Sequence, residues 1–234
     1  MRVCVVGKDG VDVSKLKERV GGLGYKVVEK NPDIVISLGG DGSFLISERK
    51  FPSVPKLAVR NTSICTKCGY GEDKLKKIFK KIEKKQFEIK KFGKIEAVIN
   101  KKGKTIRKTA INDIVIRNKE PYYGLRFVLD VNGKKVDKEL IGDGIVVSTV
   151  FGSSGYFYSI TRKTFNRGVG VAFNNITVKR KPLILADPVI KLKVTRHEAV
   201  VSADNDMKTV TIDEGDSVVV KKSDKIAKVV VMRV

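Results

Sequence analysis

A single carboxylate surrounded by glycines is the feature of this sequence with the clearest chemical implication. The motif consists of Gly39, Gly40, Asp41 and Gly42. It follows an apolar run at residues 33–38 and precedes a segment of helical pattern. Glycines at the carboxyl end of a strand let backbone N–H groups approach phosphate oxygens, and the following helix N-terminus attracts anions. Because a carboxylate repels phosphate, Asp41 is expected to act on a hydroxyl proton or Mg²⁺, as a phosphoryl transferase requires.

Two later clusters carry further polar groups. Asn112 and Asp113 stand at the head of an apolar strand, where an amide and a carboxylate suit a base edge and ribose hydroxyls, although such a pair can also be a plain turn. Residues 142–156 run from a strand into a small, hydroxyl-rich turn that lets a flat ligand lie close to the backbone. Neither common nucleotide-binding loop, Gly-x₄-Gly-Lys-Ser/Thr or Gly-x-Gly-x-x-Gly, follows a strand anywhere.

The elements that must position these residues change in character along the chain. The first part alternates strand patterns at residues 3–6, 25–28, 33–38 and 57–60 with helix patterns at 13–20, 43–51 and 72–85. Such alternation predicts a parallel sheet with helices packed on it. We expect this α/β N-terminal domain to span residues 1–86.

From about Phe87 onward, short alternating strands dominate. They are expected at residues 94–100, 105–118, 125–131, 176–178, 183–185, 190–194, 199–202, 209–212, 217–220 and 227–232, with one helix near 152–160. Asn132-Gly133 between two such runs is a strong two-residue hairpin signal. We therefore expect residues 87–234 to form a mostly antiparallel, sandwich-like β domain.

Composition narrows the classes of protein. The 234 residues are 41% hydrophobic and 32% charged, and the net charge of +22 attracts polyanions. The lysines are spread along the chain, which favours a solvated surface over a dedicated nucleic-acid-binding surface. No apolar run is long enough for a membrane span, and the first seven residues resemble a buried strand rather than a signal peptide, so we expect a cytoplasmic protein. Cys65 and Cys68 have metal-ligand spacing, but two ordinary thiols fit the sequence better.

The three clusters, in this order, resemble the NAD kinase family, whose hallmarks are Gly-Gly-Asp-Gly-Thr, an Asn-Glu strand and Asp-Gly-…-Ser-Thr-Pro-Thr-Gly-Ser-Thr-Ala-Tyr. The late segment that ends at Asp204 is similar to the family's Ser-x-Asp-Gly. The resemblance implies phosphorylation of the adenosine 2′-hydroxyl of NAD by ATP, with a divalent cation such as Mg²⁺, in a homodimer or homotetramer. It leaves open NAD or NADH as acceptor and ATP or polyphosphate as donor.

The same resemblance implies roles for individual residues. Asp41 matches the catalytic base. The phosphate-binding loop and the dinucleotide site are matched by Gly39, Gly40, Gly42, Ser43, Asn61, Asn112, Asp113, Asp143, Ser154, Gly155, Tyr156 and Ser159.

The sequence also departs from the family pattern. Ser43 replaces the family's Thr and Asp113 its Glu, while Val150 and Phe151 replace a Pro-Thr pair. Ile46 stands where many members have a basic residue. Of the family's Gly-x-Asn-x-Gly stretch only Asn61 is kept, and Ser63 occupies the final glycine position. Two alternative functions remain: a related kinase acting on another hydroxyl, as in lipid kinases that share Gly-Gly-Asp-Gly, and a nucleic-acid-binding module without activity.

Overall fold

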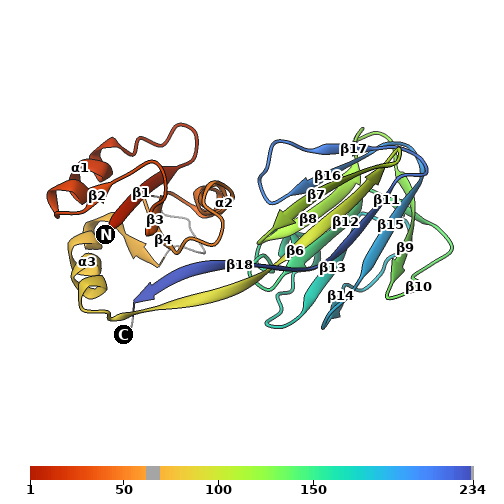
Figure 1. Ribbon diagram of the computed structural model, residues 1–234. Coiled ribbons are helices and arrows are strands. Elements are labelled where there is room, and N and C mark those ends of the chain that lie inside the picture. Colours follow the sequence, from red (N-terminus) through yellow and green to blue (C-terminus); the bar gives the residue numbers. More distant parts are fainter. Residues whose placement is uncertain (62–68, 233–234) are drawn as a thin grey trace. The chain divides into compact units, whose positions relative to one another are not determined.

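The computed structural model describes residues 1–61 and 69–232, which form two compact units (Figure 1). Unit 1 comprises Met1–Phe92 and Ile226–Val234, and unit 2 comprises Gly93–Lys225. The chain passes between the units inside two long strands, β6 (Phe87–Lys101) and β18 (Ser217–Met232). The division therefore lies a few residues beyond the expected position after residue 86, and the C-terminal strand returns to unit 1.

Unit 1 is built on a parallel sheet. Its strands follow the order β4-β3-β1-β2, with β5 and the end of β18 also parallel to β4. The elements are β1 (Arg2–Gly7), α1 (Ser14–Gly22), β2 (Lys26–Val27), β3 (Ile34–Leu38), α2 (Asp41–Lys50), β4 (Lys56–Arg60), β5 (Tyr70–Gly71), the 3₁₀ turn η1 (Glu72–Lys74) and α3 (Leu75–Glu83). This confirms the predicted α/β fold.

Both faces of this sheet are apolar because helices cover both. Val3, Val5 and Ile36 belong to a core shared with α1 and α3, which contribute Leu16 and Phe79. The opposite face of the same strands packs against α2 and the segment after it, in a cluster formed by Cys4, Val6, Val35, Ile46, Phe51 and Val54. A strand buried on both faces reads as the continuous apolar run seen in the sequence.

Unit 2 is a sandwich of antiparallel strands, as predicted. One sheet contains β10-β9-β15-β18, with β11 beside β9 and β6 beside β7; the other has the order β14-β13-β12-β8-β16-β17. The remaining strands and the helix are β7 (Lys104–Ala110), β8 (Asp113–Asn118), β9 (Leu125–Val131), β10 (Lys134–Lys135), β11 (Leu140–Gly142), β12 (Gly144–Thr149), α4 (Tyr156–Thr161), β13 (Val169–Asn174), β14 (Leu183–Leu185), β15 (Ile190–Arg196), β16 (Ala199–Ala203) and β17 (Val210–Ile212).

The core of unit 2 lies between its two sheets. It is formed by alternate residues of the facing strands, such as Ile114 and Ile116 of β8 and Phe127 and Leu129 of β9. The hairpin predicted at Asn132-Gly133 joins β9 to β10, and both turn residues have positive φ, 54° and 81°. This geometry requires a residue that tolerates the left-handed region.

Three strand predictions differ from the structure in where the strands lie, divide or join. The run at residues 105–118 is two strands, β7 and β8, which lie in different sheets because the chain turns at residues 111–112. Residues 177–178 form a bend, and the strand lies earlier, in β13, where Gly170 interrupts the pattern of apolar side chains. The runs at 217–220 and 227–232 form one continuous strand, β18, because the charged residues between them extend as an exposed stretch of strand.

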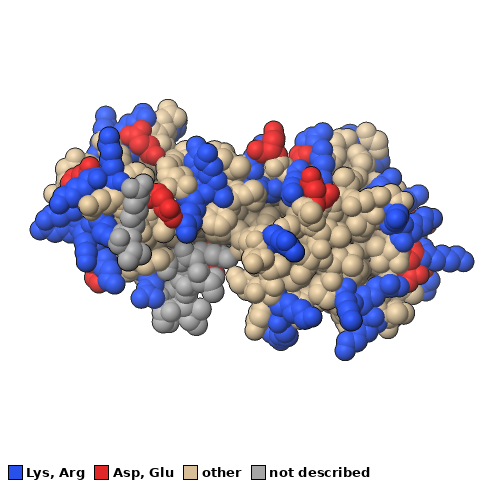
Figure 2. Space-filling model, turned by 90° about the horizontal axis from the view of Figure 1, so that it is seen from below, with Lys and Arg blue, Asp and Glu red and all other residues tan. Residues whose placement is uncertain are grey.

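The positively charged side chains that give the chain its net charge of +22 are spread over the surface. Figure 2 shows Lys and Arg side chains scattered over the visible face, with Asp and Glu interspersed, rather than gathered into one band. This distribution is that of a solvated lysine-rich surface. Within residues 1–61 and 69–232, no helix has the length and apolar character needed to cross a lipid bilayer.

Candidate functional site

In unit 1, the glycine motif connects the end of β3 to the start of α2. Gly39 has a φ of 131°, a conformation that favours glycine, and Gly40 is the extended residue that precedes the helix. Asp41 is the first residue of α2 and is half-buried. The motif therefore has the geometry predicted for it: a glycine turn that leads directly into a helix N-terminus.

Ser43 supports this turn from inside. Its side chain is fully buried, and its Oγ accepts a hydrogen bond from the backbone N–H of Lys8 at 3.2 Å. A Cβ on Gly39 would lie 2.4 Å from that same Oγ, so only glycine fits above it. Ser43 is predicted to bind the ligand, and its hydroxyl lies under the motif, where it ties α2 to the loop after β1.

Other groups lie at the same edge of the sheet. β1, β3 and β4 are parallel neighbours in register, with Gly7 opposite Leu38 and Leu38 opposite Val59. The residues that follow them therefore meet at the carboxyl edge, where ligands bind in open α/β sheets. Asn61 follows β4, and its Oδ1 would lie 3.8 Å from a Cβ on Gly39. Lys8 follows β1 and adds an exposed cation that sequence reasoning missed.

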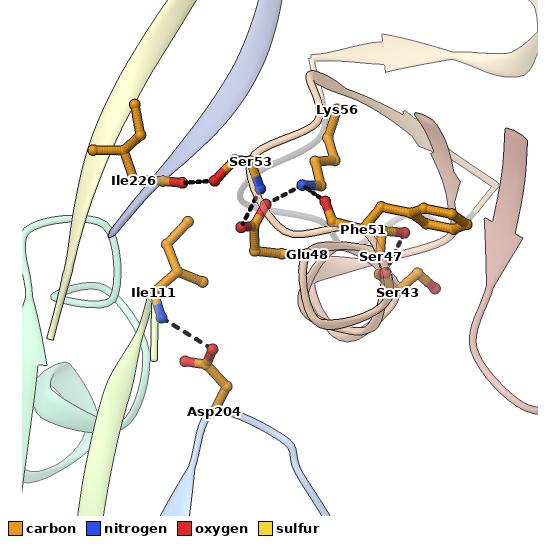
Figure 3. A network of polar contacts seen from close by, with 9 residues as sticks. All are labelled: Ser43, Ser47, Glu48, Phe51, Ser53, Lys56, Ile111, Asp204 and Ile226. Atoms are coloured by element: carbon orange, nitrogen blue, oxygen red, sulfur yellow. Dashed lines mark hydrogen bonds and ion pairs between the residues drawn. The ribbon is translucent and has the colours of Figure 1, made fainter. Parts of the chain in front are cut away.

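In unit 2, the start of β8 is held by one acidic side chain. The Asp204 carboxylate accepts backbone N–H bonds from Ile111 at 3.0 Å, from Asn112 at 2.7 Å and from Asp113 at 3.3 Å (Figure 3 shows the first). The backbone N–H of Asp204 in turn donates to the carbonyl of Asp113 at 2.9 Å. Asp204 was noticed in the sequence only as part of a resemblance, and its role follows from this contact.

The pair predicted to hold the nucleotide has unusual electrostatics. Asp113 is only 7% exposed, and burial together with the Asp204 charge raises its pKa from 3.8 to about 7. Burial also raises the pKa of Asp204, against the effect of its backbone N–H bonds. Asn112 Oδ1 is buried without a hydrogen-bond partner among the described residues. A carboxyl that titrates near neutrality beside an unsatisfied amide oxygen is typical of a functional site.

The hydroxyl-rich turn after β12 lies directly on Asn112. Thr149 Oγ1 donates to the carbonyl of Ile111 and accepts the Gly152 N–H at 3.1 Å. A Cβ on Gly152 would come within 2.2 Å of the Asn112 carbonyl oxygen, so the close approach requires glycine. Ser154 and Gly155, beyond this contact, are exposed. The turn and the Asn112–Asp113 pair thus form one cluster.

Asp143, another residue predicted to bind the dinucleotide, lies at the opposite end of β12. Ser148 pairs with Asp113, whereas Gly144 pairs with Arg117. Asp143 precedes Gly144 and is therefore about five strand residues, or roughly 17 Å, from Ser148. Its Oδ2 accepts a hydrogen bond from Asn175 Nδ2 at 3.3 Å. The predicted dinucleotide residues of unit 2 therefore divide between the two ends of β12.

Helix α4 extends toward the Asp143 end. The Tyr156 hydroxyl lies 3.3 Å from Nδ2 of Asn174, which pairs with Gly144 across the sheet. Ser159 is exposed, and its hydroxyl donates to the Tyr156 carbonyl at 2.8 Å. The ring of Tyr156 packs on the outer face of the sheet beside Val146 and Phe157. Tyr156 therefore bridges the turn at one end and the Asp143 group at the other.

A pocket of about 720 Å³ lies next to this group. Its apolar lining comes from Ile160, Phe173, Ile176 and Pro182, and its polar lining from Thr161, Asn175, Lys179, Arg180 and Lys181. Arg180 is paired with Asp137, while Lys179 and Lys181 are exposed. Asn175 also donates to Asp143. A pocket with an apolar lining and a basic rim suits a ligand that has a flat ring and phosphates.

The one described cysteine and the single histidine lie in different units. Cys4 is buried in β1, where burial raises its pKa. His197 lies in unit 2 with its ring stacked on Tyr123. Cys65 and Cys68, like Ser63, lie outside the described residues. Among the residues that are described, no three His, Cys, Asp or Glu side chains are close enough to hold a metal ion by themselves.

Comparison with known proteins relates this geometry to a family. The family model described as the ATP-NAD kinase C-terminal domain matches residues 111–232. The chain is 30% identical over 184 residues to the NAD kinase of Sulfurisphaera tokodaii, covering 76% of this chain and 70% of that protein. Several further curated relatives are longer, and the chain spans 32% to 63% of their length.

Two solved structures share the fold. A yeast NADH kinase complexed with NADH superposes with a TM-score of 0.86 and 17% identity, over 98% of this chain and 83% of that one. An NAD kinase from Archaeoglobus fulgidus in complex with ATP superposes with a TM-score of 0.80 and 22% identity, over 98% and 93%. At these identities the likeness concerns the fold.

Proposed function

The chain belongs to the NAD kinase family, and from that premise we propose that it transfers the γ-phosphoryl group of ATP to the adenosine 2′-hydroxyl of NAD, producing NADP. The observation that carries this proposal is the position of Asp41, the first residue of α2, beside glycine N–H groups at the carboxyl edge of a parallel sheet. A carboxylate at that point is suited to a hydroxyl proton rather than to a phosphate.

In this mechanism each group of unit 1 has a separate role. The Asp41 carboxylate accepts the proton of the 2′-hydroxyl as its oxygen attacks the γ-phosphorus. The new O–P bond forms while the bond to the leaving ADP oxygen breaks. Backbone N–H groups of residues 39–42 and the start of α2 offset the negative charge of the phosphoryl oxygens. Lys8, at the same edge, adds a positive charge.

Mg²⁺ enters this reaction on ATP, as part of the substrate. The ion prefers oxygen ligands and is usually held by one or two carboxylates together with substrate phosphates. Asp41 is an oxygen donor of this kind at the carboxyl edge, so the residues fit a cation that is carried by the nucleotide. Phosphoryl transfer gains from such an ion because it neutralises charge on the β- and γ-oxygens.

Unit 2 supplies the residues that we assign to the dinucleotide. Asn112 and Asp113 offer an amide and a carboxyl that suit ribose hydroxyls and a base edge. Gly152, Ser154 and Gly155 let a flat group approach the backbone, while Asp143, Tyr156 and Ser159 surround the other end of β12. The basic pocket beside Asn175 suits the phosphates of the same ligand. A cytoplasmic setting and a homodimer or homotetramer are part of this proposal.

The test begins with the product. The purified protein is incubated with Mg²⁺ and ATP or polyphosphate, and with NAD or NADH, and the product is analysed by mass spectrometry and ³¹P NMR. We expect a phosphate on the adenosine 2′-oxygen. Parallel reactions offer diacylglycerol and glucose as acceptors; preferential phosphorylation of either would instead support a related kinase.

The second part of the test concerns Asp41. Asp41→Asn should lower kcat by about 100-fold or more, the usual worth of a positioned base, with the KM for NAD nearly unchanged. The exposed Asp187→Asn is the matched control and should retain normal kcat. Near-normal turnover by Asp41→Asn would remove its role as base. Salt-sensitive DNA binding without any NADP formation would favour the nucleic-acid alternative.

A further inference from the structure

The interior of unit 1 contains an ion pair that sequence analysis did not single out. Glu48 of α2 and Lys56, the first residue of β4, are paired with 3% and 0% of their side chains exposed. Lys56 Nζ also donates to the carbonyl of Phe51, the residue directly after α2, and Glu48 Oε1 accepts the Ser53 N–H at 3.3 Å (Figure 3). The pair thus fixes the C-terminal end of α2 to the start of β4.

The network continues into the last strand and along the helix. The Ser53 hydroxyl donates to the carbonyl of Ile226 at 3.2 Å. This bond links residues 51–55, which join α2 to β4, with β18 within unit 1. Toward the other end of α2, the Ser47 hydroxyl donates to the Ser43 carbonyl at 2.9 Å, and Ser43 Oγ accepts the Lys8 N–H. Directional polar contacts therefore fix α2 at both ends.

Stability alone does not explain a fully buried pair. Removing two charges from water is costly, and well-packed apolar residues of similar size often stabilise a protein as well or better. The neighbouring contacts of α2 with the sheet, through Ile46 and Phe51, are apolar, and apolar attraction has no preferred direction. An ion pair with fixed hydrogen bonds adds a directional constraint on the helix, since its energy depends on geometry.

Glu48 lies seven residues after Asp41, close to two helical turns, so both side chains project from the same side of α2. A rotation or slide of the helix therefore moves both together. We propose that Glu48 and Lys56 are positioning residues for Asp41, which hold α2 in the register at which that carboxylate meets the acceptor hydroxyl. This inference rests on the proposed function, in which Asp41 is the base. A displacement of about 1 Å at a reacting group can cost roughly 100-fold in rate.

The test replaces the pair by apolar residues of similar size, Glu48→Leu with Lys56→Met. We expect an unfolding midpoint no lower than that of the wild type, a kcat at least 10-fold lower, and KM values for NAD and ATP within about 3-fold. The control is the exposed pair Lys17 and Glu29, also in unit 1, changed to Met and Leu; its kcat should be normal. An apolar pair with wild-type kcat would overturn the proposal.

A cycle with Asp41→Asn separates positioning from a general loss of structure. If the pair acts through Asp41, adding the apolar pair to Asp41→Asn causes little further loss of kcat, because the two changes remove the same contribution. Multiplicative losses would overturn the proposal. A fully active Asp41→Asn protein would instead remove the role of Asp41 as base in the proposed function, whereas an inactive Asp41→Asn protein beside a fully active apolar pair would overturn only this inference.

A second variant covers the case in which the apolar pair fails to fold. Glu48→Gln with Lys56→Gln keeps hydrogen-bonding groups at both positions without charge, and the same fall in kcat and the same cycle with Asp41→Asn are expected. If neither double variant folds, the pair is needed for stability itself, and a positional role is overturned.

Discussion

The carboxylate of Asp204 accepts the backbone N–H of Asn112 at 2.7 Å, although the two residues are separated by 92 positions in the chain. β16 and β8 are antiparallel neighbours, and Ala203 pairs with Ile114, so the end of one strand delivers Asp204 to the start of the other. The contact sets the backbone from which Asn112 and Asp113 project. An acidic residue that is absent from the predicted site therefore shapes it.

Removing this acceptor should loosen the nucleotide pair. Asp204→Ala leaves three N–H groups, those of residues 111–113, without their acceptor. Each charge-assisted hydrogen bond contributes about 1.5–3 kcal/mol, and the cost of burying the charge offsets part of this gain. We therefore expect the unfolding free energy to fall by about 2 kcal/mol. The KM for NAD should rise about 10-fold. Asp204→Asn keeps an acceptor oxygen, so its unfolding free energy and its KM for NAD should lie between those of the wild type and Asp204→Ala. Chemical denaturation and steady-state kinetics measure both effects, and an unchanged KM in Asp204→Ala would contradict the positioning role.

Asp113 should make stability fall as pH rises toward neutrality. Its pKa is about 7 in the folded protein and 3.8 ordinarily, so between these values the folded state holds a proton that the unfolded state has released. The stabilisation from the neutral form is complete below about pH 4 and is lost as pH rises through 7. Asp113→Asn removes this dependence. Its unfolding free energy should therefore exceed that of the wild type by near zero at pH 4 and by on the order of 4 kcal/mol at pH 8.

The measurement for Asp113 is a series of denaturation curves from pH 4 to 8 for both proteins. Asp130→Asn is a suitable comparison because this carboxyl belongs to β9, accepts the Gly133 N–H and lies outside the nucleotide cluster. A pH-independent difference between wild type and Asp113→Asn would show that the carboxyl does not titrate in this range.

Gly152→Ala should damage the turn that lies on Asn112. The added Cβ would come 2.2 Å from the Asn112 carbonyl oxygen, a backbone atom that cannot move aside as a flexible side chain would. We expect a loss of about 1–3 kcal/mol of stability and a higher KM for NAD, with less effect on the KM for ATP. Gly21→Ala is the control, because a Cβ there meets nothing within 4 Å. Equal behaviour of the two variants would contradict the close packing.

The basic rim of the unit 2 pocket should matter for dinucleotide affinity. Reversing two charges with Lys179→Glu and Lys181→Glu should raise the KM for NAD about 10-fold or more, and added salt should reduce the difference from wild type. Lys134→Glu with Lys135→Glu makes the same charge change on exposed β10 of unit 2. If both double variants raise the KM equally, the effect is general electrostatic attraction and not the pocket.

Much of the fold could be read locally. The apolar runs of β1 and β3 and the apolar positions of α3 at Leu75, Ile78, Phe79 and Ile82 predict these elements because burial imposes a period on neighbouring residues. The Asn132-Gly133 hairpin was predicted for the same local reason, since φ preference belongs to the residue itself. The strands that were misplaced, near residue 176 and around residues 221–225, have glycine or charge where the local signal should be.

The sequence by itself determined the glycine-flanked carboxylate at the end of a buried strand, the change from parallel α/β to antiparallel β, and the polar head of β8. Only the tertiary structure decided that Ser43 lies beneath the motif, that Asp143 and Asn112 stand at opposite ends of β12, and that Lys56 is buried against Glu48. These relationships depend on which strands pair and in what register. That choice is made by burial summed over distant segments, so no stretch of neighbouring residues contains it.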